Sequence, residues 1–398
     1  MTRTIAVVTG TRADYGLLRW VLAEIAERDD LELRLIVTGS HLSPAFGETW
    51  RAIADDGFSI DERVDILDDD DSALGNARAM GRATSGIAEA LERLHPDLVV
   101  LLGDRYEILG AASAALLLGI PIAHLAGGEV TEGAFDDAIR HAVTKLSSLH
   151  FPAADAYRAR ILQLGEDPAM VVTVGATGFD NFERLHLLDR DGLAAELGIV
   201  LDGRPLVACT FHPETLAGVT PEQALAPVFE ALNALPELQV IFTKANADVG
   251  GRRINALLDA FVSEHADRMW AFASLGQVRY LSLLTVADVV LGNSSSGIIE
   301  APVAGTPTVN IGDRQAGRLR APSILDVPNV AGRIREAVEK ALTPESHELA
   351  ARRESPYGTP GAARLVVDRL ATVDLDALRT KQFHQHPHPQ SPQGAEHV

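Results

Sequence analysis

The sequence predicts an α/β protein built from two similar halves, each a parallel β-sheet covered by helices on both faces. The chain has 398 residues, which suggests two domains of ordinary size. Short apolar runs typical of strands alternate with helical patterns along almost the whole chain, as in repeated β-α-β units. The same alternation begins again after a polar stretch near residues 187–203. A boundary between the halves is therefore expected near residues 178–204.

The first half is expected to contain strands that are buried on both faces, because its apolar runs are nearly continuous. These runs lie at residues 4–9 (TIAVVT), 31–37 (LELRLIV), 97–102 (DLVVLL), 121–125 (PIAHL), 149–151 (LHF) and 170–175 (MVVTVG). Helical patterns fall near residues 15–28, 107–118 and 134–147. This alternation predicts a Rossmann-like half.

The second half repeats the pattern and is also expected to be Rossmann-like. Its strands are predicted at residues 204–211 (RPLVACTF), 238–243 (LQVIFT), 268–273 (RMWAFA), 287–292 (ADVVLG) and 307–312 (PTVNIG), with helices near 221–235 and 250–265. Ligands of such sheets bind beyond the carboxyl ends of the strands. The cleft between the two halves is therefore the expected ligand site.

Composition excludes several classes of function. The net charge is −20, from 55 acidic and 35 basic residues, which argues against a nucleic-acid partner. Cys209 is the single cysteine, so no intrachain disulfide can form, as is typical of a reducing cytoplasm. The N-terminus has no signal-peptide pattern. Gly119 to Pro121 interrupt the apolar stretch at 109–128, which favours a core helix and a strand over a membrane span.

Two polar segments are expected to be solvated. The acidic run at 65–72 (DILDDDDS) could bind a metal, but a solvated acidic loop is the favoured interpretation. The polar end of the chain, rich in Pro, Gln and His, predicts a disordered tail over residues 380–398.

Charged side chains follow two strands of the first half. In TGTRADYG, Gly10 permits a tight turn and Arg12 could face a phosphate with Asp14 orienting it; a surface Arg–Asp pair is the alternative. In GDRYE, Asp104 and Arg105 come directly after a buried strand. Asp104 could therefore lie at the ligand edge of the sheet or cap the following helix.

A denser group follows the strand at 121–125, in AHLAGGEVTEGAFDDAIRH. Asp136 and Arg140 share a helix face, as do Asp137 and His141. Clustered carboxylates near a histidine suit proton transfer, because neighbouring charges shift their pKa values towards neutrality. Structural salt bridges are the alternative for Asp137 and Glu132, and explain Glu129 less well. The group comprises His124, Glu129, Glu132, Asp136, Asp137, Arg140 and His141.

The second half presents polar groups at its own strand ends. His212 follows the first strand, and Lys244, Asn246 and Asp248 follow the next. In GNSSSGIIE, backbone and side-chain donors at a helix N-terminus can bind a phosphate, and Glu300, one turn further on, can accept both hydroxyls of a ribose. A capping serine is the alternative, but explains only one serine. The donors are Asn293, Ser294, Ser295 and Gly297, and Arg314 and Arg318 follow the next strand.

Taken together, these motifs resemble the UDP-N-acetylglucosamine 2-epimerase family, and more narrowly its hydrolysing branch. The resemblance rests on TGTRADYG, GDRYE, GGEVTEGAFDDAIRHAVTKLSSLHF, GNSSSGIIEAPVAGTPTVNIGDRQAGR and PYGTPGAA, and covers residues 4–370. It implies a GT-B-like fold with the nucleotide sugar in the interdomain cleft. The implied domains are residues 1–180 with a crossing helix near 358–372, and residues 181–357.

The resemblance also implies a metal-free reaction that needs no cofactor. A base removes the C2 proton while the nucleoside diphosphate leaves C1, and water then adds to the resulting glycal as C2 is reprotonated on the other face. Carried over motif by motif, the catalytic residues are Asp104, Glu129, Asp136 and His212. The implied substrate-binding residues are Arg12, Asp14, Arg105, Arg140, Asn246, Asn293, Ser294, Ser295, Gly297, Glu300 and Arg314.

One position departs from the family pattern. Sialic-acid-type relatives often have a glutamate where this chain has Ala126, in HLAGGE. The first expectation is a hydrolysing 2-epimerase that converts UDP-N-acetylglucosamine to N-acetylmannosamine and UDP. Ala126 points to an alternative, a UDP- or GDP-linked N,N'-diacetylbacillosamine of legionaminic-type acid synthesis. A GT-B glycosyltransferase and a nucleotide-sugar sensor are alternatives of other classes, and the family implies a homo-oligomer, commonly a dimer or tetramer.

Overall fold

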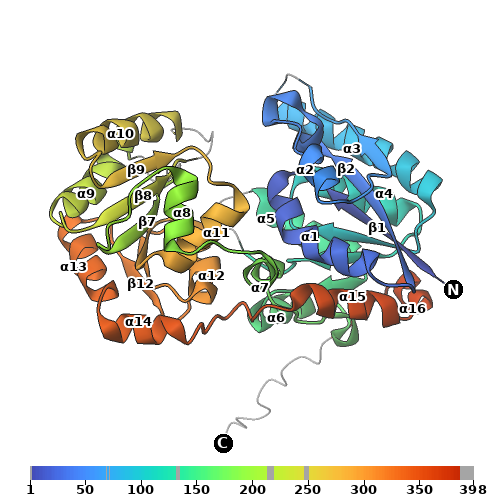
Figure 1. Cartoon of the computed structure of the whole chain (residues 1–398). Helices are drawn as coiled ribbons and strands as arrows, with labels where there is room; N and C mark the ends of the chain where they lie inside the picture. Colours follow the sequence, from blue (N-terminus) through green and yellow to red (C-terminus); the bar gives the residue numbers. More distant parts are fainter. Residues whose placement is uncertain are drawn as a thin grey trace, which may run out of the picture. The chain divides into compact units, whose positions relative to one another are not determined.

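The computed structural model describes residues 2–68, 70, 72–130, 135–212, 219–245 and 251–385. The chain forms two compact units (Figure 1). The N-terminal unit comprises Met1–Thr177 and Gly361–Val398, and the C-terminal unit comprises Gly178–Pro360.

The N-terminal unit contains a six-stranded sheet in the order β3-β2-β1-β4-β5-β6, and every neighbouring pair is parallel. Its strands are β1 (Arg3–Thr9), β2 (Leu31–Thr38), β3 (Glu62–Val64), β4 (Leu98–Leu102), β5 (Ile122–Leu125) and β6 (Leu149–Phe151). Its helices are α1 (Arg12–Ala26), η1 (Gly39–Leu42), η2 (Pro44–Phe46), α2 (Trp50–Asp55), α3 (Ala73–Leu94), α4 (Tyr106–Leu117), α5 (Phe135–Leu146), α6 (Asp155–Gln163), η3 (Pro168–Met170), α15 (Ala362–Thr372) and α16 (Leu375–Arg379).

Alternate side chains of each strand enter two different cores, one on each face of this sheet. Ile5 and Val7 of β1 pack with residues of α1 and α15, whereas Ala6 and Val8 pack with residues of α3 and α4. The two-residue period of a strand produces this division. In Figure 1, α15 lies beside α1, and Leu378 of α16 also belongs to the first core, so the last helices of the chain complete it.

The C-terminal unit contains a second parallel sheet in the order β12-β11-β10-β7-β8-β9. Its strands are β7 (Leu206–Thr210), β8 (Gln239–Thr243), β9 (Met269–Phe272), β10 (Val289–Gly292), β11 (Thr308–Ile311) and β12 (Ile324–Val327). Its helices are η4 (Thr177–Phe179, which begins at the boundary), α7 (Asp180–Arg184), α8 (Arg190–Leu197), α9 (Pro221–Asn233), α10 (Gly251–Glu264), α11 (Gly276–Val286), α12 (Ser295–Ala304), α13 (Ala331–Ala341) and α14 (Pro344–Ala351).

This sheet is likewise covered on both faces. Val207 and Cys209 of β7 pack with α9, α10 and α13, while Leu206 and Ala208 pack with α8, α11 and α12. The predicted α/β class, with two parallel sheets, is confirmed. The predicted strand-end residues that the structure describes therefore follow the carboxyl ends of strands in one sheet or the other.

Three details differ from the sequence prediction. The run at 170–175 is not a strand: Val171 forms only an isolated bridge with His150, because Pro168 starts a short 3-10 helix just before it. The short edge strands β3 and β12 were not predicted, since each has few fully buried residues. Residues 381–385, expected within a disordered tail, are described and make specific contacts, while 386–398 lie outside the described residues.

Candidate active site

Asp104 and Arg140 meet at the carboxyl end of β4 in the N-terminal unit. Asp104 does not cap the next helix: the N-cap of α4 is Arg105, whose side chain makes no capping bond. Instead the Asp104 carboxylate accepts a short hydrogen bond from the guanidinium of Arg140, on α5. Arg140 is almost fully buried, so its guanidinium holds the Asp104 carboxylate in a fixed position at the strand end. The ligand-edge alternative for Asp104 is thus the one the fold supports.

The first turns of α5 carry the other polar residues of this group. Arg140 also lies 3.5 Å from Asp137, and Asp137 lies 3.4 Å from His141. Asp136 is instead close enough to Asp104 for the two charges to interact. Burial, with the neighbouring charge of Asp104, raises the pKa of Asp136. A carboxyl whose pKa is raised towards neutrality, beside a second carboxyl, is suited to passing a proton.

His124 has a structural role. It is fully buried in β5, with Nε2 2.8 Å from the Gly103 carbonyl and Nδ1 3.2 Å from the Thr144 hydroxyl. Burial lowers the pKa of His124 to about 3, so the ring is neutral at physiological pH. Because Nε2 faces a carbonyl, it must carry the proton. His124 therefore connects the turn that presents Asp104 to the helix that presents Arg140.

A buried glutamate that the sequence analysis missed, Glu107, has its carboxylate beside the turn that follows β1. Glu107, in the first turn of α4, is fully buried, and its Oε1 is 2.5 Å from Nε of Arg105. A Cβ at Gly10 would lie 2.6 Å from that oxygen, so Gly10 is required for the close approach of the β1–α1 turn. The signal was an acidic residue within an otherwise apolar helix, two positions after Arg105.

The Asp14 carboxyl interacts with the charges of Arg105 and Glu107, and not with Arg12. Arg12 starts α1 and is exposed, and the structure shows no ion pair or hydrogen bond of its side chain among the described residues. Asp14 is instead close to Arg105 and Glu107. Burial raises the pKa of Asp14 to about 6, against the opposing charge of Arg105. The predicted Arg12–Asp14 pair is therefore replaced by an Asp14–Arg105–Glu107 group.

The raised pKa of Asp14 predicts that the stability of the protein depends on pH. The pKa of Asp14 in the fold, about 6, exceeds its ordinary value of 3.8. Its contribution to the free energy of unfolding is therefore complete below pH 3.8 and is lost as the pH rises through about 6. Asp14→Asn stays neutral, and is expected to exceed the wild type in free energy of unfolding by about 3 kcal/mol at pH 8, with a smaller difference at pH 5. Urea unfolding at both pH values measures this. Asp29→Asn, at an exposed site, is the control, and an equal difference at both pH values would contradict the assignment.

The turn after β5 holds a non-glycine residue in the left-handed region. Ala126 has φ of 60°, a conformation that costs energy for a residue with a Cβ and that is concentrated at functional sites. Gly127 and Gly128 follow it, and the half-buried Glu129 comes next. Glu132 lies outside the described residues. The strained turn thus places Glu129 at the same sheet edge as Asp104, on the neighbouring strand.

The C-terminal unit builds its strand-end site around Asn293. This fully buried side chain accepts a hydrogen bond from the His212 backbone N–H at 2.7 Å and donates to the His212 carbonyl at 2.9 Å. The backbone carbonyl of Asn293 in turn accepts hydrogen bonds from the side chains of Arg314 at 3.1 Å and Gln315 at 2.9 Å. Asn293 is therefore a clamp that joins three strand ends. Gln315, which is buried, was missed because one glutamine gives no sequence pattern.

The N-terminus of α12 starts at this clamp. Ser294 is the N-cap and its hydroxyl accepts a bond from the Ser296 N–H at 3.4 Å. Ser294 and Ser295 are half-buried, while Ser296 is bonded to the Tyr280 hydroxyl. Gly297 lets the helix pack closely on the sheet, since a Cβ there would lie 3.1 Å from Thr308. The capping role and an open helix N-terminus thus coexist, and the latter can receive an anion.

Glu300 lies one turn into α12 with an enclosed carboxylate. Its Oε2 has no hydrogen-bond partner among the described residues, and burial raises its pKa. A buried acceptor without a partner is costly unless a ligand or water supplies a donor. The Oε2 atom of Glu300 can therefore accept a hydrogen bond from a hydroxyl group of a ligand.

The remaining predicted residues fall into three cases. Arg314 is exposed but tied to the Asn293 carbonyl. His212 is half-buried, with its backbone clamped by Asn293. Asn246 and Asp248 lie outside the described residues, and Lys244 forms an ion pair with Asp259 at 2.7 Å.

Within the described ranges, no three His, Cys, Asp or Glu side chains gather in a way that could hold a metal ion. Over those ranges, too, the helices are all too short or too polar to cross a bilayer.

Comparison with known proteins adds a family and a fold. The family model for UDP-N-acetylglucosamine 2-epimerase matches residues 23–371. A GDP/UDP-N,N'-diacetylbacillosamine 2-epimerase (hydrolyzing) of Campylobacter jejuni is 42% identical over 324 residues, covering 81% of this chain and 84% of the relative. A UDP-N,N'-diacetylbacillosamine 2-epimerase (hydrolyzing) of Legionella pneumophila is 37% identical over 344 residues, covering 86% and 89%. The crystal structure of UDP-GlcNAc 2-epimerase from Neisseria meningitidis bound to UDP-GlcNAc has a similar fold, with a TM-score of 0.79 at 19% identity over 92% of this chain and 99% of that one.

Proposed function

Because the chain belongs to the UDP-N-acetylglucosamine 2-epimerase family, on its hydrolysing branch, we propose that it is a hydrolysing 2-epimerase of a nucleoside-diphosphate-linked 2,4-diacetamido sugar of the bacillosamine type. Family membership confirms the predicted resemblance and the prediction of an enzyme. The observation that carries the choice of sugar is the identity of 42% to a relative of that specificity over most of both chains. Ala126, where a glutamate stands in sialic-acid-type members, supports the same choice.

The proposed reaction has two stages. A base removes the C2 proton as the bond from C1 to the diphosphate oxygen breaks, which gives a glycal and the nucleoside diphosphate. Water then adds its oxygen to C1, and an acid delivers a proton to C2 from the opposite face. The products are the free 2-epimeric sugar and the nucleoside diphosphate.

The N-terminal unit supplies the proton chemistry in this proposal. Asp104, held in place by the Arg140 guanidinium, is assigned as the base, while burial raises the pKa of Asp136, which is assigned as the acid. Glu129 is assigned to the same set by its place on the neighbouring strand end. His212, in the C-terminal unit, is assigned as a further acid or orienting group.

The small side chain of Ala126 supports the choice of sugar on physical grounds. A glutamate at this position would add a carboxylate to the turn after β5, whereas the half-buried Ala126 contributes only a small apolar side chain. Relative to N-acetylglucosamine, a 2,4-diacetamido-2,4,6-trideoxyhexose has an acetamido group in place of the 4-hydroxyl and no 6-hydroxyl. Such a ligand needs space and apolar surface where a more polar sugar needs a hydrogen-bond acceptor.

The C-terminal unit is proposed to hold the nucleotide, with the diphosphate at the N-terminus of α12 and the ribose at Glu300. Ser294→Ala combined with Glu300→Ala removes the capping hydroxyl and the enclosed acceptor, and is expected to weaken UDP binding by about 100-fold. Calorimetry with UDP measures this directly. Glu336→Ala, on the exposed surface of the same unit, is the control. Unchanged UDP affinity in the double variant would remove the nucleotide from this end of α12.

The proposed function is tested in deuterated water with three substrates, each followed by NMR. They are a UDP-linked and a GDP-linked 2,4-diacetamido-trideoxyhexose, and UDP-N-acetylglucosamine. We expect release of the free 2-epimer of a diacetamido sugar with deuterium at C2. Release of deuterated N-acetylmannosamine alone would instead make UDP-N-acetylglucosamine the substrate. Turnover of none of them, with tight UDP binding, would overturn the proposal in favour of a transferase or a sensor.

A further inference from the structure

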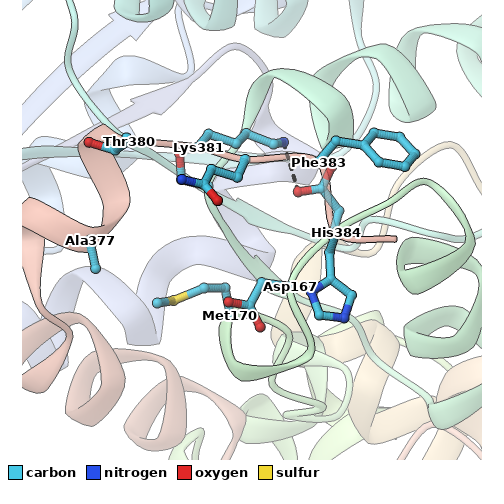
Figure 2. A pocket seen from close by; sticks show the side chains of 10 residues that line it. Asp167, Met170, Ala377, Thr380, Lys381, Phe383 and His384 are labelled. Atoms are coloured by element: carbon cyan, nitrogen blue, oxygen red, sulfur yellow. Dashed lines mark ion pairs between the residues drawn. The ribbon is translucent and has the colours of Figure 1, made fainter. Parts of the chain in front are cut away.

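The segment after α16 is bound to the N-terminal unit by specific contacts. This tail strap (residues 381–384) lines a small pocket with Asp167, Met170 and Ala377 (Figure 2). The His384 N–H donates to the Gly165 carbonyl at 2.9 Å. The Phe383 ring lies against Gly165, where a Cβ would come within 2.4 Å of it, and the Lys145 ammonium lies 4.8 Å from the ring centroid.

Lys381 anchors the strap in a buried group of charges. Its ammonium lies 2.7 Å from Glu166, which also accepts from Lys145 at 2.9 Å and from His150 at 3.0 Å (Figure 2 shows the Lys381 ion pair as a dashed line). Glu166 and His150 are both buried. Burial alone would raise the pKa of Glu166, but bonds from His150, Lys381 and Lys145 lower it to about 2. Glu166 is therefore ionised and held from three directions.

The Lys381 ammonium also caps the C-terminus of helix α5. It donates to the carbonyls of Lys145 at 2.6 Å and Ser147 at 2.5 Å, which are among the groups that a helix C-terminus leaves without partners. A cation at this end is also favoured by the helix dipole. The same helix is held by Lys145, which donates to the Leu164 carbonyl at 3.0 Å.

The opposite end of α5 carries the residues assigned to proton transfer. Asp136 is in the first turn and Arg140 pairs with Asp104. Between the two ends, the Thr144 hydroxyl contacts both the Arg140 carbonyl and His124. Residues 136 and 145 lie about 13 Å apart along the axis, at 1.5 Å per residue. A short helix transmits a displacement of one end to the other, because its hydrogen bonds make it stiff.

We propose that Lys381 is a positioning residue for the reaction: by capping α5 and pairing with Glu166, it fixes the helix that presents Asp136 and Arg140. This inference rests on the proposed function for its catalytic consequence. The contacts themselves do not depend on it. The C-terminal segment, although polar and far along the chain from the carboxylates, thus belongs to the support of the active site.

The test compares three variants of the full chain. Lys381→Met removes the charge and both donors but keeps the length of the side chain, and Glu166 retains Lys145 and His150. Lys381→Arg keeps a cation that can donate to the same acceptors. Arg379→Met is the control, because Arg379 is exposed and pairs only with nearby Asp376 among the described contacts. Each is assayed for turnover and for amide hydrogen exchange resolved by peptide.

We expect Lys381→Met to lower kcat by about 10- to 100-fold while KM stays within about twofold, because a misplaced catalytic group costs turnover more than binding. Amide exchange should rise in α5 but not in α9 of the C-terminal unit. Lys381→Arg should restore most of kcat, and Arg379→Met should match the wild type.

Two results would overturn the positioning role. One is wild-type kcat and α5 exchange in Lys381→Met. The other is a rise in exchange throughout the N-terminal unit, with kcat falling only as the fraction of folded protein falls, which would make Lys381 merely a stabilising residue. If the wild type turns over no sugar, the proposed function fails while the exchange measurement still decides whether Lys381 holds α5.

Discussion

Replacing Asp104 with asparagine is expected to lower turnover by about 10²- to 10⁴-fold, the usual worth of a general acid or base, while UDP affinity stays unchanged. Asparagine keeps the size of the side chain but cannot take up a proton. It also leaves Arg140 buried beside a neutral group. In deuterated water, the variant should fail to exchange the C2 proton of the substrate as well as fail to release the free sugar.

Asp97→Asn is a matched control on the same strand. Asp97 lies just before β4, at the end opposite to Asp104, and accepts a hydrogen bond from the Thr4 N–H at 2.9 Å. An asparagine oxygen can accept that bond, so turnover should remain close to that of the wild type. Wild-type turnover by Asp104→Asn would remove Asp104 from the mechanism. A parallel loss of UDP affinity in calorimetry would mean that the substitution perturbs the fold rather than the chemistry.

Gly292→Ala is expected to destabilise the C-terminal unit by about 3 kcal/mol or more. Gly292 has φ of 135°, and a Cβ there would lie 1.9 Å from the Thr210 carbonyl oxygen. Neither backbone can move away easily, because β10 and β7 are paired at this point. Since Asn293 and the start of α12 follow directly, the variant should also lose UDP binding.

The measurement is urea unfolding with hydrogen exchange resolved by peptide, because two units need not unfold together. Gly332→Ala is the matched control within the same unit. Gly332 is exposed in the first turn of α13, and a Cβ there meets nothing within 4 Å. That substitution should raise stability by up to about 1 kcal/mol, the helix propensity of alanine over glycine. Equal stability of Gly292→Ala and the wild type would contradict the steric account.

The fold was predictable because parallel strands with two covered faces appear in a sequence as separate apolar runs. Ten of these runs correspond to strands of the structure, within one or two residues at each end. The exceptions are informative. The segment at 170–175 is apolar but lies after a proline that starts a 3-10 helix, and β3 and β12 are short edge strands whose residues are partly exposed. Apolar periodicity reports burial, and so cannot identify an exposed edge strand.

The site was predictable only as far as strand ends reveal it. Asp104, Glu129 and Ser294 follow buried strands and were identified from that position. Their partners could not be, because the Asp104–Arg140 and Asn293–His212 contacts join residues far apart in the chain. Glu107 and Gln315 were missed for a similar reason, since only the folded structure shows that a polar side chain is buried beside the candidate site.

The placement of α15 has a consequence for the order in which the protein folds during synthesis. Ala362, Ala363 and Val366 complete the core around β1 and α1, yet they are translated after the whole C-terminal unit. At about 5–20 residues per second, the ribosome needs roughly 10–40 s to make the chain from Gly178 to Pro360. The nascent N-terminal unit therefore waits with an incomplete core, while the continuous C-terminal unit can fold as soon as it emerges. A nascent chain arrested before Ala362 therefore leaves the apolar face of α1 without the cover that α15 provides in the complete protein.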